Sequence, residues 1–138
     1  MTPNCIFCKI VKGEIPASKV YEDKNSLAFL DISPINKGHT LLIPKEHYED
    51  LFDLPEDKLK ELSVTLKKVS KAVLNGVKAD GLNVGMNNKP ASGQIVFHAH
   101  FHIIPRYKND GLKHWPQKKY DNNEEMDKYA EMIANNLS

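Results

Sequence analysis

One helical stripe dominates the hydrophobic pattern of the chain. After Pro55, leucine and valine recur at spacings of three and four residues, which places them along one side of an α-helix. Lysine is frequent on the opposite side, and Gly76 suits the end of the helix. We therefore predict one long helix whose apolar side packs on a second layer of structure. Its stripe consists of Leu59, Leu62, Leu66, Val69 and Val73.

Shorter apolar runs, bounded by turn residues, predict an antiparallel sheet. These runs cover residues 18–22, 27–32, 39–44, 82–87 and 95–105. A short helix over residues 5–12, ended by Gly13, precedes the first run, and a last helix is predicted from about Asn123. The predicted fold class is α+β, with about five antiparallel strands packed with one long helix and a short N-terminal helix.

Length and charge narrow the class of protein. A chain of 138 residues indicates one domain, and past Arg106 it becomes polar, so we expect a core over residues 5–107 and a C-terminal extension over 108–138. The net charge of +1 gives no broad positive field to hold nucleic acid. No stretch approaches the roughly 20 apolar residues of a membrane span, and the first residues show no secretory signal. We expect a cytoplasmic protein with neither a nucleic-acid nor a membrane partner.

The most informative segment is residues 97–104, which read FHAHFHII. His98, His100 and His102 alternate with apolar residues, so on a strand all three rings would project from one face. Such a set could bind a metal ion, or its middle imidazole could attack phosphorus as a nucleophile. A metal triad usually draws on carboxylates, and none occurs between Asp80 and Asp110, although a distant one could fold in.

These residues resemble the histidine triad (HIT) family, in which three histidines alternate with apolar residues. Further segments that resemble its nucleotide-binding branch read, in order, CIFCKIVKGEIPASKVYED, LAFLDISPINKGHTLLIPKEH, LNVGMNN and SGQIVFHAHFHIIPR. The resemblance implies the HIT-like fold and a homodimer that pairs sheet edges and long helices. It also implies a hydrolase that cleaves purine nucleoside 5′-phosphoramidates or similar nucleotidyl conjugates through a covalent nucleotidyl-histidine, with AMP or GMP as ligand. The alternatives are a dinucleoside polyphosphate hydrolase and a nucleotide-binding regulator with little turnover.

The resemblance also assigns roles to residues around the phosphate. His100 would be the nucleophile, His102 would bind a nonbridging oxygen, and His39 would support the triad that His98 begins. Asn87 would position the phosphate. Backbone N–H groups of Gly93, Gln94 and Ile95 would donate to its oxygens. Ile95 stands where many relatives carry serine or threonine, which leaves the preference for a leaving group open.

The nucleoside would be held, by the same resemblance, between the first helix and the second strand. Asp31 would accept hydrogen bonds from the ribose hydroxyls, a recognition that apolar contact cannot supply. The apolar walls around the base would be Phe7, Ile10, Phe29 and Ile32. Without the resemblance, Asp31 would be interpreted as a turn residue before Ser33-Pro34 and the four apolar residues as core.

Cys5 and Cys8 form a C-x-x-C pair with three interpretations. A thioredoxin-type redox pair normally follows a strand, and no strand is predicted before residue 5. Two incidental buried thiols are the second interpretation, and half of a zinc site is the third. Family members with a structural zinc hold it by such a pair, a histidine after the third strand and the first triad histidine, which here are His47 and His98. Two thiolates and two imidazoles would close a tetrahedron around a structural Zn²⁺.

Overall fold

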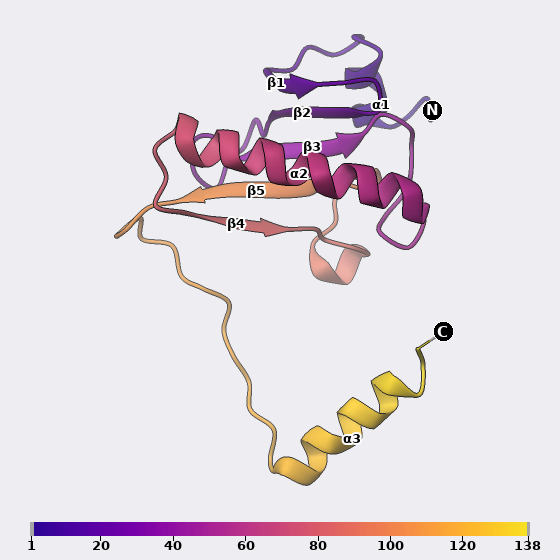
Figure 1. The fold of residues 1–138 in the computed structure, drawn as a ribbon, viewed down its shortest axis with the longest axis vertical. Coiled ribbons are helices and arrows are strands. Elements are labelled where there is room, and N and C mark those ends of the chain that lie inside the picture. The colour runs from indigo at the N-terminus through magenta and orange to yellow at the C-terminus, as the bar shows by residue number, and fades with distance from the viewer. Residues whose placement is uncertain (1, 138) are drawn as a thin grey trace.

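A five-stranded antiparallel sheet forms the centre of the molecule. The computed structural model describes residues 2–137, and its sheet has the order β1-β2-β3-β5-β4 (Figure 1). Its strands are β1 (Lys19–Glu22), β2 (Ser26–Leu30), β3 (Thr40–Pro44), β4 (Gly81–Gly85) and β5 (Phe101–Arg106). Every neighbouring pair runs antiparallel. The predicted α+β class and strand number are confirmed, and β1 and β4 are the two edge strands.

Two helices cover opposite faces of this sheet. The long helix α2 (Glu56–Gly76) crosses one face (Figure 1) and buries the predicted stripe, with Leu62, Val69 and Val73 fully buried. The short helix α1 (Ile6–Val11) packs on the other face, where Phe7 and Ile10 join a second apolar cluster with side chains of β2 and β3. Alternate residues of each central strand therefore face α2 and α1 in turn. The chemistry described below lies on the α1 face.

The predicted strand over residues 95–105 is too long. The chain bends at residues 96–98, and β5 begins only at Phe101. The Ala99 N–H donates to the Tyr48 carbonyl at 2.7 Å instead of to a neighbouring strand. Ala99 and Ile103 still pack in the α2 cluster as predicted. Phe97 does not, and it is 41% exposed, because the bend turns it out of the alternation.

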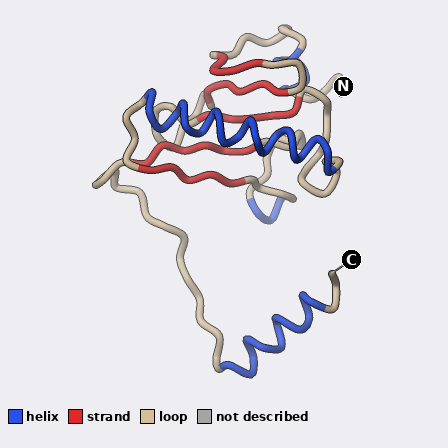
Figure 2. The backbone as a smooth tube through the Cα atoms, viewed as in Figure 1, coloured by secondary structure: helices blue, strands red, loops and turns tan. Residues whose placement is uncertain are grey.

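The C-terminal extension leaves the domain. It runs as an irregular segment to a last helix, α3 (Asn123–Ala134), which begins at the predicted Asn123 and stands apart from the sheet (Figure 2). A single 3-10 turn, η1 (Pro90–Ser92), interrupts the loop between β4 and β5. Within residues 2–137 no helix combines the length and the apolar character that would let it cross a membrane.

Candidate active site and metal centre

The segment 98–102 contributes its histidines to two separate clusters. His98 turns toward α1 and meets Cys5, Cys8 and His47, whereas His102 meets His39 on β3's approach. His100 lies between them, with its ring centroid 4.9 Å from that of His102. The three rings therefore do not act as one chelating set, because the bend before β5 separates His98 from the other two.

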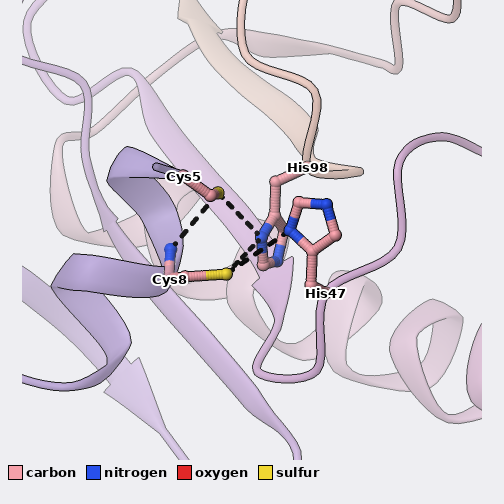
Figure 3. Close-up of side chains that lie close together, drawn as sticks. All are labelled: Cys5, Cys8, His47 and His98. Atoms are coloured by element: carbon pink, nitrogen blue, oxygen red, sulfur yellow. Dashed lines mark hydrogen bonds between the residues drawn. The ribbon is translucent and has the colours of Figure 1, made fainter. Parts of the chain in front are cut away.

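Four ligand atoms of the first cluster converge on one point (Figure 3). His98 Nδ1 lies 3.4 Å from Cys5 Sγ and 3.6 Å from Cys8 Sγ, and His47 Nδ1 lies 3.4 Å from Cys8 Sγ. In a tetrahedron with ordinary zinc–sulfur and zinc–nitrogen bonds, the sulfur-to-nitrogen edge is about 3.5 Å. The cluster therefore has the donor set and the size to hold a metal ion, as predicted for these four residues.

Hydrogen bonds around this cluster already orient its ligands. The His98 Nε2–H donates to the Pro44 carbonyl at 2.8 Å, so in the neutral ring Nδ1 keeps its lone pair and faces both sulfurs. The Cys8 N–H donates to Cys5 Sγ at 3.4 Å. Burial raises the pKa of the Cys5 thiol, so a bound cation would have to displace that proton.

His100 has the opposite orientation. Its Nδ1–H donates to the His98 carbonyl at 2.7 Å, which leaves Nε2 as the nitrogen with a lone pair. The side chain is 6% exposed, and the edge of Phe7 lies against it with centroids 5.1 Å apart. Burial lowers the pKa of His100, so the ring is neutral near pH 7. A neutral imidazole with a fixed, unprotonated Nε2 can act as a nucleophile.

His39 and His102 form a hydrogen-bonded relay. The Ile35 N–H donates to His39 Nδ1 at 3.1 Å, so the proton of neutral His39 resides on Nε2. That Nε2–H donates to His102 Nδ1 at 2.9 Å, which leaves the His102 Nε2–H as a free donor toward the site. Burial, with smaller contributions from His100 and His39, lowers the pKa of His102 to about 4. Burial also lowers the pKa of His39.

Asp31 is the distant carboxylate that folds in beside the relay. Its Oδ2 lies 3.8 Å from His39 Nε2, while Oδ1 accepts a hydrogen bond from the Ser33 N–H at 2.8 Å. The residue is therefore both a turn residue and a neighbour of the histidines. Ligand atoms of Asp31, His39 and His102 lie within 4.8 Å of one another. Because His39 Nε2 already donates its proton to His102, this group forms a relay and not a chelate.

The apolar residues assigned to the base divide into two sets. Phe7, Ile10 and Phe29 are buried in the cluster between α1 and the sheet, as their interpretation as core residues predicts. Phe7 nevertheless contacts His100. Ile32 is 97% exposed and belongs to no core. The contribution of these residues to base binding remains a prediction.

The loop over residues 87–95 carries the remaining predicted residues. The N–H groups of Gly93 and Gln94 donate to carbonyls of this same loop, at 3.0 and 3.4 Å, so binding a phosphate would require these bonds to be exchanged. Gly93 has a φ of +97°, which favours glycine. Ile95 is 86% exposed. Asn87 lines a cavity of about 720 Å³ that opens beside His102 and is bounded by residues 112–117 of the extension.

Sequence reasoning missed the residues that hold this loop. Three polar contacts join it to the segment that follows His47. They are Lys89 Nζ to Asp50 Oδ2 at 2.8 Å, Gln94 Nε2 to the Glu49 carbonyl at 2.7 Å, and the Leu51 N–H to Asn88 Oδ1 at 2.8 Å. Asp50 is 3% exposed. In the sequence Asp50 is one polar residue before a helix, so no local signal could identify it.

Comparison with known proteins extends these observations. A model of the HIT domain matches residues 12–109. An uncharacterized HIT-like protein of Methanocaldococcus jannaschii is 55% identical over 107 residues, which are 78% of this chain and 82% of that protein. A Schizosaccharomyces pombe protein named adenosine 5′-monophosphoramidase is 48% identical over 75% of this chain and 74% of its own length. An Arabidopsis thaliana protein named adenylylsulfatase is 41% identical over 79% of this chain and 55% of its own length.

Solved structures agree with the fold. A crystal structure from Streptococcus mutans matches with a TM-score of 0.94 at 41% identity and covers 100% of this chain and 88% of that one. Residues 111–137 are 27 of the 138, so without them that score could not exceed about 0.80, and the likeness therefore includes the extension. A zinc-bound histidine triad protein from Mycobacterium smegmatis matches with a TM-score of 0.76 at 36% identity, over 96% of this chain and 97% of that one.

Proposed function

This chain belongs to the HIT family, and from that premise we propose that it hydrolyses purine nucleoside 5′-phosphoramidates or similar nucleotidyl conjugates. The observation that carries the proposal is His100, whose Nδ1–H is committed to a backbone carbonyl so that Nε2 is free to attack. Relatives named for nucleotide hydrolysis support the reaction class. The ligand would be a purine mononucleotide such as AMP or GMP.

The reaction would proceed in two displacements at the α-phosphorus. His100 Nε2 forms a bond to phosphorus while the phosphorus–nitrogen bond of the substrate breaks, and the amine leaves after taking up a proton. Water then forms a bond to phosphorus, the bond to His100 breaks, and a proton is released with the nucleotide. The His102 Nε2–H would donate to a nonbridging oxygen, and Asn87 would hold the same phosphate.

Binding of the nucleoside would follow the family pattern. Asp31 would accept the ribose hydroxyls through its second oxygen, close to His39. Phe7, which lies against His100, would provide part of the apolar surface near the base, with Ile32 able to move over it because it is exposed. The exposed Ile95 offers no hydroxyl to a leaving group, so conjugates with an apolar amine suit this site better than those with a charged one.

We propose further that the cysteine–histidine cluster binds zinc. The sulfur-to-nitrogen distances and the fixed Nδ1 of His98 support a closed tetrahedral site, and a zinc-bound relative supports the choice of metal. Its four protein ligands leave no position for substrate, so the ion would be structural. The free thiols fit a reducing, cytoplasmic compartment. The edge strand β4 and the exposed side of α2 support a homodimer.

The decisive experiment replaces His100 by asparagine. We expect turnover of an adenosine phosphoramidate to fall by about a thousandfold or more, because the nucleophile is lost. Acid-labile label from a radiolabelled substrate should appear on the wild-type chain in quenched reactions and be absent from the variant. An unchanged midpoint of thermal unfolding would show that the variant is folded. Unchanged turnover would refute the assignment of His100.

The same assay separates the alternatives. Competition between the phosphoramidate and a diadenosine polyphosphate, compared by kcat/KM, would favour the hydrolase of dinucleoside polyphosphates if the second substrate is preferred. Tight binding of AMP with neither turnover nor labelled histidine would instead favour the nucleotide-binding regulator.

A further inference from the structure

The C-terminal arm, defined as residues 111–137, has no cover from its own domain. It leaves from the end of β5 and carries α3 beyond the β4 edge of the sheet (Figure 1). None of the residues of α3 is buried. One side of the helix and the residue that follows it are apolar, with exposed fractions between 44% and 80%. These side chains are Met126, Tyr129, Ile133 and Leu137.

The direction of the arm is fixed at its root. Arg106 at the end of β5 donates to both carboxylate oxygens of Asp110, at 2.8 and 3.1 Å, and to the Leu112 carbonyl at 3.1 Å. Asp110 also accepts a hydrogen bond from Asn36 Nδ2 at 3.1 Å. Such a bidentate pair with additional hydrogen bonds is a specific geometry. The arm is therefore aimed away from the domain by built contacts.

The helix at the end of the arm is complete but would be marginal alone. Asn122 Oδ1 accepts a hydrogen bond from the Glu125 N–H at 2.8 Å, and Glu125 Oε1 accepts one from the Asp121 N–H at 3.0 Å, so the first turn is capped on both sides. An isolated helix of about 12 residues gains too little from its backbone bonds to persist in water. The Streptococcus mutans structure has the arm in the same place, which indicates that something stabilises it there.

We propose that α3 packs on a second copy of this chain, with the exposed side of its α2 as the receiving surface. The charges of the two helices are opposite. Residues 121–137 contain five acidic residues and one lysine, a net charge of −4. The exposed side of α2 carries Lys60, Lys67 and Lys71 around Val64, which is 73% exposed. Lysine stems and Val64 can cover apolar side chains while the ammonium groups meet the carboxylates.

The position of the arm favours a second copy over other occupants. β4 is an edge strand with unpaired backbone groups, and the arm extends past this edge (Figure 2). A copy placed against the edge by a twofold axis would lie beneath the arm, and each copy would both give and receive a helix. A lipid surface fits less well, because membrane-bound amphipathic helices carry lysine and arginine on the polar side, whereas that of α3 is mostly acidic.

The first test measures the dimer of the full chain by sedimentation equilibrium. Tyr129→Asp and Ile133→Asp place a carboxylate on the apolar side of α3, and we expect each to raise the dimer dissociation constant about tenfold or more. Lys128→Asp is the matched control, since it adds the same carboxylate on the opposite side, and it should change the constant less than about threefold. Equal effects of the three variants would overturn the proposal.

The second test identifies the receiving surface. Lys67→Glu with Lys71→Glu should weaken the dimer about tenfold, and Glu124→Lys with Glu131→Lys in the same chain should restore most of that loss. A photoreactive phenylalanine analogue in place of Tyr129 should give covalent dimers whose cross-linked peptide comes from α2. Cross-links within one chain, or to another part of the partner, would contradict the proposed surface. Because none of these readouts involves turnover, they can fail or succeed independently of the proposed reaction.

Discussion

His98 and His100 are two residues apart and have opposite chemical roles, and the difference comes from two backbone carbonyls. The Pro44 carbonyl takes the Nε2–H of His98, which turns Nδ1 toward the two sulfurs. The His98 carbonyl takes the Nδ1–H of His100, which leaves Nε2 free. Both rings are buried. Similar side chains in similar burial can therefore provide a metal ligand at one position and a nucleophile at the other.

The two clusters also differ in how they are closed. The metal centre is completed by protein ligands on all sides, whereas the relay from His39 ends in a free His102 Nε2–H that faces the site. We expect loss of the first to act on the stability of the fold and loss of the second to act on turnover. The predictions below test that division.

The largest effect should come from the metal centre. Removal of the metal by a chelator, or Cys8→Ala, should lower the free energy of unfolding by about 3 kcal/mol or more, because buried ligand groups lose the ion that neutralises them. Urea unfolding followed by circular dichroism, with metal content from elemental analysis, would measure this. His100→Asn is the comparison and should keep its metal. Loss of turnover on chelation before any loss of structure would indicate a catalytic metal and break the division.

The relay should give the next largest effect. His39→Ala removes the Nε2–H that orients His102, and kcat/KM should fall about tenfold to a hundredfold, as for other groups that orient a functional histidine. The free energy of unfolding should change much less than in Cys8→Ala, and the metal content should not change. A variant with full kcat/KM would show that His102 does not need the relay.

A smaller effect should connect the two regions. Asp50→Asn keeps the acceptor for the Phe52 and Asp53 N–H groups but removes the charge that pairs with Lys89. The 87–95 loop should become less ordered, which would raise KM about threefold to tenfold with kcat nearly unchanged. Asp53→Asn is the matched control, since its carboxylate caps the Glu49 N–H and does not contact the loop. A KM equal in the two variants would contradict this role for Asp50.

The smallest effect should be a dependence of stability on pH. The pKa of His102 is about 4 in the folded chain against an ordinary 6.5, because burial disfavours its charged form. Between these values the unfolded chain binds a proton that the folded chain does not. The free energy of unfolding should therefore fall as pH decreases from about 6.5 to about 4, and this residue adds no further loss below that. Urea unfolding of the wild type and His102→Gln over this interval should show a shallower decline in the variant; parallel declines would contradict the assignment.

The sequence by itself determined most of the fold and the identity of the reactive groups. The α2 stripe, the five strands and the start of α3 follow from periodicity and turn residues, since these patterns are local. The family pattern likewise identified Cys5, Cys8, His47 and His98, which the fold brings together.

Only the tertiary structure decided how those groups are oriented. The bend before β5, which exposes Phe97 and separates His98 from His102, depends on a hydrogen bond between Ala99 and Tyr48, 51 residues apart. The free nitrogen of each histidine depends on carbonyl and N–H groups of other segments, and the role of Asp50 depends on a contact with Lys89. Sequence patterns record which face a residue occupies, but a hydrogen bond between distant segments exists only once the chain has folded.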